Sequence, residues 1–524
     1  MKKLSKKQQK WIERTVANDR SYKILVYNRF FVCALAFVAQ LLIFVLSLSA
    51  FSSVGWVVEL TFGVCTVAFV LYVISRDDYR PTKVSWIILI LAFPLVGASA
   101  YFLYGNGNST HRLKTRYDRA SAALEKLPQD EDALKTETEN GRNGQLSFYL
   151  SARGAPVYAD GDVEYFPTGK AAFASMKTAL ENATDYVLME YFIVAGGKMW
   201  KEILEILLRK AAQGVKIKII YDDFGSILVL PPRYARYLES LHENVQCLAF
   251  NPVRPIFSMQ TNHRDHRKIL VVDGKVAYTG GMNIADEYVD EKKRFGYWKD
   301  SAVKLTGSPV RSLVYAFLQT WKAYKDADCD PAPYLDAVQP SAPCTGCIQP
   351  FIDGPTDGEW FGETVYLDMI NRAKEYVYIT TPYLVLDDVM RLALSSAAKR
   401  GVDVRIVTPA VPDKKTVYRL TRANYGALLC AGVKIYEYTP GFIHAKNVVS
   451  DGYAVVGTIN FDYRSFYHHF ENAVYFSHAG AVAQVKRDFE ETVAVSRERN
   501  LDNYKRNFFG KVFDSVLRFV EPLL

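Results

Sequence analysis

Apolar and polar positions divide the chain into an N-terminal part with long apolar stretches and a much longer part of mixed character. The stretches lie at 30–51, 54–74 and 86–103. Each is long enough, or nearly so, to cross about 30 Å of hydrocarbon as a helix. We therefore expect a membrane region at 29–105, in which Pro94 would also permit a re-entrant or interfacial third helix.

Basic residues around the stretches predict their orientation. The leader at 1–28 and the segment between the second and third stretches contain several Lys and Arg residues, which favours the cytoplasmic side for both. The segment after the third stretch is also basic. We expect a multi-pass protein of the cell membrane whose other domains lie in the cytoplasm. A cleaved signal peptide is not expected, because the leader and its apolar run are both too long.

Beyond residue 145, short apolar runs alternate with segments that have the spacing of amphipathic helices. A run that begins at Tyr186, a helical segment at 200–212 and a second run after Gly214 predict a strand, a helix and a strand. The same order recurs between Tyr376 and Val407. Such units connect parallel strands, so we expect two similar α/β domains with largely parallel sheets, facing each other across one shared site.

The repeat sets the expected domain boundaries. We expect a linker at 106–144, a first domain at 145–330, a proline-rich linker at 331–344, a second domain at 345–500 and a helix at 501–524. The last segment has apolar residues at helical spacing and basic residues nearby, which predicts either a helix on the lipid surface or one packed on the protein itself. The chain has 524 residues, 49% of them hydrophobic, more than a single core can use.

One short pattern of His, Lys and Asp occurs once in each expected domain, with one residue between His and Lys and four between Lys and Asp. Its members are His266, Lys268 and Asp273 in the first copy and His444, Lys446 and Asp451 in the second. Each copy lies on an apolar run and leads into a Gly-x-x-Asn turn, which ends at Asn283 or Asn460. A single copy would carry little information. Two copies in equivalent places indicate a shared chemical role.

The residue types in this pattern suit attack on a phosphodiester. On a strand, residues i and i+2 point to the same face, so His266 and Lys268 can both reach one cleft. An imidazole supplies a nucleophile or a proton donor, and Lys and Asn side chains hold phosphoryl oxygens. Two histidines on opposite sides of one phosphorus permit a two-step exchange through a phosphohistidine. This chemistry needs neither a metal nor another cofactor.

The two copies differ in one spacing. Six residues separate Asp273 from Gly280, but only five separate Asp451 from Gly457. A hairpin turn that is one residue shorter after Asp451 would absorb the difference. The same shortening would otherwise move the carboxylate out of place, and the spacing leaves both outcomes open.

The sequence around the motifs resembles the phospholipase D superfamily and, within it, the bacterial cardiolipin synthases. The matching segments are 266–288, 442–446, 460–466 and 470–474. The resemblance covers nearly the whole chain and implies two α/β/α sandwich domains that form one site. It also implies transfer of a phosphatidyl group between two phosphatidylglycerol molecules, which gives cardiolipin and glycerol. Asp300 and Glu471 would then orient the histidine rings.

Roles for the motif residues follow from the chemistry and the resemblance together. We expect His266 to be the nucleophile and His444 the acid and then the base, although the similarity of the halves permits the reverse. The expected phosphate-binding residues are Lys268, Lys446, Asn283 and Asn460. Asp273 and Asp451 would shape the site rather than exchange protons. A hydrolase of the phospholipase D type, another phosphatidyltransferase, a nuclease and a non-catalytic scaffold are the alternatives.

The remaining features of composition change this picture little. The net charge of +8 fits an anionic membrane or substrate but is modest for a chain of this length. The seven cysteines predict no disulfide framework, and the single Cys344 and Cys347 pair lacks a partner pair for a metal. His468 and His469 precede Glu471, which permits a place near the site, but a solvent-exposed strand end is the stronger expectation. The expected partners are phospholipids and the membrane, and not nucleic acid.

Overall fold

The computed structural model describes residues 55–501, except 77–79, 106–107, 141–143, 253–262 and 328, together with positions 37, 38, 40, 42, 517 and 518. The expected leader at 1–28, most of the apolar stretch at 30–51 and most of the segment at 501–524 lie outside the described residues. The described residues from 113 to 501 belong to one compact unit, which holds both halves of the repeat. Residues 55–112 belong to a second unit.

The first half of the repeat contains a seven-stranded mixed sheet. In spatial order its strands are β2 (Asp162–Phe166), β9 (Ala302–Thr306), β7 (Val276–Gly280), β6 (Lys268–Val272), β3 (Tyr186–Tyr191), β4 (Lys216–Asp222) and β5 (Val245–Phe250). The helices are α9 (Gly169–Glu181), α10 (Lys198–Ala211), α11 (Asp223–Ser226), α12 (Tyr234–Glu239), a 3-10 turn (Asp286–Val289) and α13 (Val310–Tyr324).

The second half contains a nine-stranded mixed sheet. In spatial order its strands are β1 (Tyr158–Asp160), β10 (Pro343–Asp353), β17 (Glu471–Phe476), β16 (Tyr453–Gly457), β15 (Asn447–Ser450), β11 (Tyr376–Thr380), β12 (Asp403–Pro409), β13 (Lys434–Tyr438) and β18 (Ser496–Arg499). The helices are α14 (Ala332–Leu335), α15 (Phe361–Arg372), α16 (Asp388–Lys399), α17 (Lys415–Cys430), α18 (Tyr463–Tyr467) and α19 (Ala479–Ala494).

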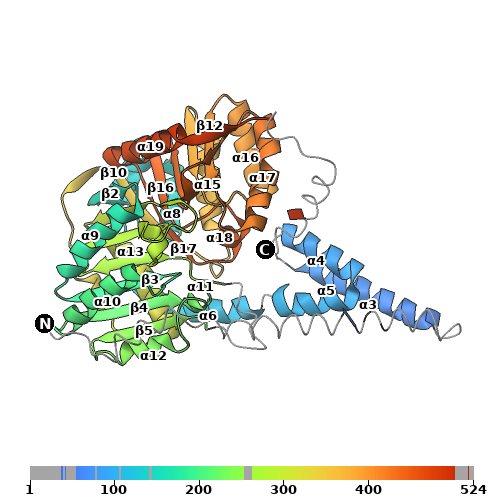
Figure 1. Ribbon diagram of the computed structural model, residues 1–524, viewed down its shortest axis with the longest axis horizontal. Coiled ribbons are helices and arrows are strands. Elements are labelled where there is room, and N and C mark those ends of the chain that lie inside the picture. The colour runs from blue at the N-terminus through green and yellow to red at the C-terminus, as the bar shows by residue number, and fades with distance from the viewer. Residues whose placement is uncertain are drawn as a thin grey trace. The chain divides into compact units, whose positions relative to one another are not determined.

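The predicted strand, helix and strand units are confirmed in both halves. Strands β3, β4 and β5 run parallel, as do β11, β12 and β13, and α10 and α16 form the crossovers (Figure 1). The expectation of largely parallel sheets is wrong for the rest of each sheet. Each histidine motif enters a tight hairpin, β6–β7 or β15–β16, and a hairpin of this kind makes its two strands antiparallel.

Alternating residues of the central strands explain why helices cover both faces of the first sheet. Val187 and Met189 of β3 pack in the same cluster as residues of α9 and α10. Leu188, which points to the opposite face, packs with residues of α13. Both faces are apolar, so neither can be left to water, and the layers are helix, sheet and helix.

A single apolar core joins the two halves. It contains Phe317 and Trp321 of α13, Val449 and Val474 of the second sheet, and Phe489 of α19. Polar contacts cross the same interface. The Tyr165 hydroxyl donates to Asp488 at 2.7 Å, and Lys299 Nζ lies 2.6 Å from the same carboxylate. The short strand β14 (Gly441–Ile443) also pairs with β8 (Tyr297–Lys299) across it. The two halves therefore form one body.

The N-terminal unit contains three helices and a π-helical turn in its described part. They are α3 (Gly55–Ser75), α4 (Arg80–Ala92), α5 (Pro94–Ala100) and the turn Tyr101–Gly105. The third apolar stretch is thus not one helix, because Phe93 has a non-helical backbone before Pro94, which has no N–H to continue the ladder. Among the described helices, none has both the length and the apolar character needed to cross a bilayer. The expected spanning helices are not supported there.

The expected linkers also contain regular structure. The segment at 106–144 includes α6 (Asn108–Ala122) and α7 (Glu131–Asn140), followed by α8 (Gly144–Ala152). In the segment at 331–344, α14 precedes the start of β10, which also holds the free cysteines Cys344 and Cys347. Leu113 and Tyr117 of α6 and Tyr334 of α14 are buried in the core of the catalytic unit, so these segments are part of its fold.

Candidate active site

Each motif lies where a strand begins at the interface between the halves. The main-chain N–H of His266 donates to the Phe470 carbonyl at 2.8 Å, and that of His444 donates to the Lys299 carbonyl at 2.7 Å. Both acceptors belong to the opposite half of the repeat. The residue that follows each acceptor in the chain carries a carboxyl group, Glu471 after Phe470 and Asp300 after Lys299.

The two imidazoles contact carboxylates from the opposite half. His266 Nδ1 lies 2.8 and 2.9 Å from the two oxygens of Glu471, and His444 Nδ1 lies 2.7 Å from Asp300 Oδ2. Both carboxyl groups are fully buried. A hydrogen bond at Nδ1 fixes the orientation of a ring and leaves Nε2 available for chemistry. Neither half contains a complete histidine and carboxylate pair by itself.

Burial and neighbouring positive charge keep both imidazoles neutral at neutral pH. The pKa of His266 is lowered well below its usual value by burial, by Lys268 and, from the other half, by Lys446 and His444. The pKa of His444 is lowered to about 4 by burial and Lys446, although Asp300 opposes the shift. The charges of one motif thus act on the histidine of the other, as expected for groups in a shared site.

The motif lysines point to the same region as the histidines. Lys268 Nζ donates to the His266 carbonyl at 2.5 Å, and Lys446 Nζ lies 2.8 and 3.0 Å from the ring nitrogens of His444. Burial lowers the pKa of Lys268 to about 7 and that of Lys446 to about 8. An anion bound between them would favour the charged ammonium forms. The site is therefore suited to an anionic group.

The two buried carboxyl groups differ in their preferred charge. Burial raises the pKa of Glu471 well above its usual value, with Lys268 acting against this shift. Burial also acts to raise the pKa of Asp300, but His444 and Lys446 outweigh it, and the pKa is lowered. Asp300 is therefore the fixed negative charge of the site, whereas Glu471 readily takes up a proton.

The motif aspartates lie at the opposite ends of the hairpins from the histidines. Asp273 accepts hydrogen bonds from the main-chain N–H groups of Asp185 at 2.8 Å and Thr184 at 2.9 Å. Asp451 does the same for Lys374 at 2.7 Å and Glu375 at 3.2 Å. The strand β6, whose five residues span about 16 Å, lies between Asp273 and His266. The structure therefore does not bring these aspartates to the catalytic cluster; they hold each hairpin to the start of a central strand.

The shorter spacing in the second motif is absorbed by its turn. Three residues separate the paired Val272 and Val276, but only two separate the paired Ser450 and Tyr453. The backbone of Asp451 has positive φ, as has that of Asp273, and a two-residue hairpin turn requires this geometry. Asp451 consequently keeps the same main-chain partners as its counterpart despite the deletion.

The two asparagines occupy different environments. Asn283 accepts from the Ile193 N–H at 3.1 Å and donates from Nδ2 to the Tyr288 hydroxyl at 2.7 Å. Asn460 is 5% exposed, and its Oδ1 has no hydrogen-bond partner within the part of the chain that the structure describes. Asn283 thus holds Tyr288, whose ring lies 5.3 Å from that of His444.

Several contacts of the histidines were not predicted from the sequence. Phe192 lies 5.0 Å from the His266 ring, and Trp298 lies 5.5 Å from the His444 ring. Thr458 donates to the Glu471 carboxylate. Thr458 lies in the Gly-x-x-Asn turn, and Trp298 lies two residues before Asp300. Their nearness in the sequence to predicted site residues is the one feature from which their place in the site could have been predicted.

His469 also lies in the site, contrary to the expectation of a solvent-exposed strand end. Its ring is 5.5 Å from that of His266, and its side chain is only 10% exposed. The residue directly follows α18 and its loop rather than continuing an exposed strand. The fold of this loop against the first half of the repeat explains its burial.

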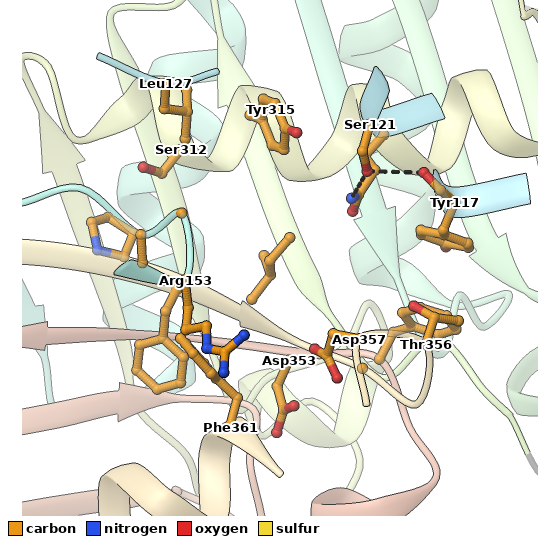
Figure 2. A pocket seen from close by; sticks show the side chains of 18 of the residues that line it. Tyr117, Ser121, Leu127, Arg153, Ser312, Tyr315, Asp353, Thr356, Asp357 and Phe361 are labelled. Carbon is orange, nitrogen blue, oxygen red and sulfur yellow. Dashed lines mark hydrogen bonds between the residues drawn. The ribbon is translucent and has the colours of Figure 1, made fainter. Parts of the chain in front are cut away.

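A separate cavity of about 390 Å³ contacts the reverse side of the first motif (Figure 2). Arg267 and Phe470 line it, but the motif histidines His266 and His444 do not. Figure 2 shows Asp353 and Asp357 close to each other in this cavity, with Arg153 nearby. Burial raises the pKa of Asp357 to about 7. This cavity is distinct from the site that contains the two imidazoles.

Comparisons with known proteins agree with two repeated domains that carry one motif each. A family profile described as "Cardiolipin synthase, PLD-like domain" matches residues 176–296 and 366–493, and one described as "Phospholipase_D-nuclease N-terminal" matches 64–106. A cardiolipin synthase of Halalkalibacterium halodurans is 34% identical over 486 residues, which cover 90% of this chain and 95% of the relative. An uncharacterized protein of Streptococcus mutans is 42% identical over 464 residues, with coverage of 87% and 100%.

A solved structure shows a similar fold at low sequence identity. The crystal structure of phosphatidylserine synthase from Haemophilus influenzae superposes with a TM-score of 0.56 and 14% identity. The match covers 72% of this chain and 99% of that chain. Two repeated α/β domains with mixed sheets are therefore shared by the two proteins.

Proposed function

Because the chain belongs to the cardiolipin synthase family and carries its phospholipase D-like domains, we propose that it is a phosphatidyltransferase that makes cardiolipin. The reaction moves the phosphatidyl group of one phosphatidylglycerol to the free glycerol hydroxyl of another and releases glycerol. The observation that carries this proposal is the pair of histidines held by carboxyl groups from opposite halves, His266 with Glu471 and His444 with Asp300.

The first step forms a covalent intermediate. His266 Nε2 attacks the phosphorus of the donor lipid, a P–N bond forms, and the P–O bond to glycerol breaks. His444 gives its proton to the leaving glycerol oxygen. The negative charge of the bound phosphodiester raises the pKa of His444 from its low value, so that the ring carries this proton when substrate is present.

The second step reverses the roles of proton donor and acceptor. The glycerol hydroxyl of the second lipid attacks the phosphohistidine, and His444 removes its proton. The P–N bond breaks, cardiolipin leaves and His266 is regenerated. Water that attacks in place of the second lipid would give phosphatidic acid, so the same site would hydrolyse lipid if water were admitted.

The difference between the two carboxyl groups supports this division of roles. Asp300, whose pKa is lowered, stabilises a positively charged His444 while the ring carries a proton. Glu471 has a raised pKa and provides less stabilisation for a charged His266, which favours the neutral, nucleophilic ring. His266 is therefore the better nucleophile and His444 the better proton carrier.

The other residues bind the phosphate and maintain the hairpins. Lys268 and Lys446 neutralise the phosphoryl oxygens, and the side-chain amides of Asn283 and Asn460 donate to them. Asp273 and Asp451 hold the hairpins that carry the lysines and take no part in proton transfer. No metal is assigned to the reaction.

The N-terminal unit keeps the enzyme at its lipid substrate, with the catalytic unit on the cytoplasmic side. The described helices α3 and α4 expose many large apolar side chains, among them Leu60, Val64, Leu71 and Leu91, each 56% exposed or more. Apolar surface of this extent is unfavourable in water and favourable against acyl chains. Removal of residues 1–105 should release the catalytic unit from the membrane fraction of cells.

The proposal is tested with purified protein and phosphatidylglycerol as the sole lipid. Cardiolipin and free glycerol should appear in equal amounts, and phosphatidic acid as the main product would indicate a hydrolase. In His444→Ala, mass spectrometry should find the phosphatidyl group on His266. A covalent adduct on any other residue would reject the role of His266.

A further inference from the structure

His469 is a further imidazole beside His266 and Glu471. It belongs to neither motif and has no role in the proposed mechanism. Its Nδ1 lies 3.7 Å from Glu471 Oε1, and the side chain is only 10% exposed. This nitrogen has no hydrogen-bond partner among the described residues. A buried imidazole nitrogen that points to a carboxyl group without a hydrogen bond is costly unless another group binds it.

The surrounding geometry suits a transition-metal ion. One ligand atom each from His266, His469 and Glu471 lie within 4.8 Å of one another. Two imidazole nitrogens and one carboxylate oxygen form the ligand set found in many zinc sites, and they leave a fourth position open. Mg²⁺ and Ca²⁺ prefer oxygen ligands, so this set selects against them.

We propose that His266, His469 and Glu471 bind a divalent transition-metal ion such as Zn²⁺, and that this ion reversibly inhibits the transferase. The inhibitory part rests on the proposed function, because it requires His266 to be the nucleophile. Metal binding itself does not depend on that role.

The inhibition follows from the protonation of imidazole. His266 Nδ1 faces Glu471 at 2.8 Å, and it is the ring nitrogen that the metal would occupy. A neutral imidazole with a metal on Nδ1 carries its proton on Nε2. Nε2 then has no lone pair for attack on phosphorus, and Glu471 no longer orients the ring. Lys268 is close to this position and opposes a cation, so we expect binding weaker than that of a structural zinc site.

Metal binding is tested first without lipid. Purified full-length protein is stripped with EDTA and titrated with Co²⁺, whose visible absorption reports nitrogen and oxygen coordination, and then with Zn²⁺ in competition. We expect one site per chain. His469→Asn should weaken Co²⁺ binding at least tenfold. The matched control is His478→Asn, which alters a helix N-cap elsewhere that asparagine can also form; its binding should equal that of the wild type.

Inhibition is then measured against the metal-free activity of each protein. Zn²⁺ should inhibit the wild type and His478→Asn at the concentration that fills the site, and EDTA should restore activity. His469→Asn should need at least tenfold more Zn²⁺ for the same inhibition. His469→Gln serves as a second variant if the first does not fold, as judged by its thermal melting.

The outcomes separate this inference from the proposed function. Absence of Co²⁺ binding, or equal binding in His469→Asn and the wild type, would overturn the metal site. Binding that requires His469 but does not inhibit would overturn the inhibitory part. Binding that requires His469 in a protein that makes no cardiolipin from phosphatidylglycerol would retain the site and reject the proposed reaction.

Discussion

His266 and His444 occupy equivalent positions on equivalent hairpins, yet the groups around them differ. Beside His444, the turn residue Gly281 packs against the Asp300 carboxylate, which carries a fixed negative charge. Beside His266, the equivalent turn residue is Thr458, whose hydroxyl donates to Glu471, and burial raises the pKa of Glu471. The shared backbone brings both rings to one place, while the side chains around them favour different protonation states.

This comparison shows how a repeat can form an asymmetric site. Repetition gives each half one imidazole and one lysine at the interface, and in the proposed reaction these groups surround one phosphodiester. A nucleophile and a proton carrier need different pKa values. Here the halves differ in the turn residue, Gly281 or Thr458, and in the carboxyl partner, Asp300 or Glu471. The asymmetry also makes the roles of the two halves testable by exchanging small groups.

The largest effect is expected from removing either histidine. His266→Ala should lose activity by about 10⁴-fold or more on any substrate, because no nucleophile remains. His444→Ala should lose about 10²- to 10⁴-fold on phosphatidylglycerol. With p-nitrophenol as the leaving group, no proton donor is needed. His444→Ala should then regain most of the wild-type rate of the first step, measured as release of p-nitrophenol. Recovery in His266→Ala instead would reverse the two roles.

Changing the carboxyl partners should give unequal effects. Asp300→Asn removes a fixed negative charge from His444 and should lower kcat by about 100-fold, whereas Glu471→Gln changes a carboxyl group whose pKa is already raised by burial and should cost about tenfold. The alkaline limb of the kcat profile should move to lower pH in Asp300→Asn, because the protonated form of His444 that serves the leaving glycerol loses its stabilisation. Steady-state rates from pH 4 to 9 measure both effects. Equal losses would contradict the proposed asymmetry.

Two glycines at different positions of the Gly-x-x-Asn turns, Gly281 and Gly457, should fail in different ways when they are replaced by alanine. A methyl group at Gly281 would lie 2.1 Å from Asp300 Oδ1, so Gly281→Ala should displace this carboxylate and lower kcat about tenfold. A methyl group at Gly457 would lie 2.4 Å from Ala473 Cβ inside the sheet, so Gly457→Ala should instead reduce the free energy of unfolding by about 1–3 kcal/mol. Urea unfolding and kcat separate the two results. A purely catalytic defect in Gly457→Ala would argue against this reading.

The smallest effect on chemistry is expected from the motif aspartates. Asp273→Ala and Asp451→Ala each remove hydrogen bonds from main-chain N–H groups to a carboxylate and should reduce the free energy of unfolding by about 1–3 kcal/mol. Activity should remain within a few-fold of the wild type well below the melting temperature. Loss of activity in a fully folded Asp273→Ala protein would return this residue to the catalytic cluster.

The Asp273 carboxylate also predicts a pH dependence of stability. Burial raises its pKa, but hydrogen bonds from Asp185 and Thr184 outweigh this and lower the pKa in the folded state. Its contribution to stability is therefore present above about pH 4, the value for an unfolded aspartate, and is lost as the pH falls through the lower folded value. Asp273→Asn should flatten this part of the curve, as measured by urea unfolding between pH 2.5 and 6.

Local patterns in the sequence were sufficient for much of the architecture. Alternation at Tyr186 and helical spacing at 200–212 predicted the crossover units, since these periods follow directly from strand and helix geometry. The histidine and lysine spacing predicted side chains on one face for the same reason. The third apolar stretch was expected to be one helix, either crossing or re-entrant at Pro94, but the structure divides it there because Pro94 lacks the N–H that would continue the helix.

The sequence by itself determined the repeat, the two motifs and the chemical class of residues that meet a phosphodiester, because each depends on short-range periodicity and residue type. Only the tertiary structure decided that Glu471 faces His266, that Asp300 faces His444, and that His469 lies inside the site. These contacts join the two halves of the repeat, and the burial of the imidazoles and carboxyl groups shifts the pKa of each of them. Neither the approach of distant segments nor the loss of water around them is encoded in any local spacing.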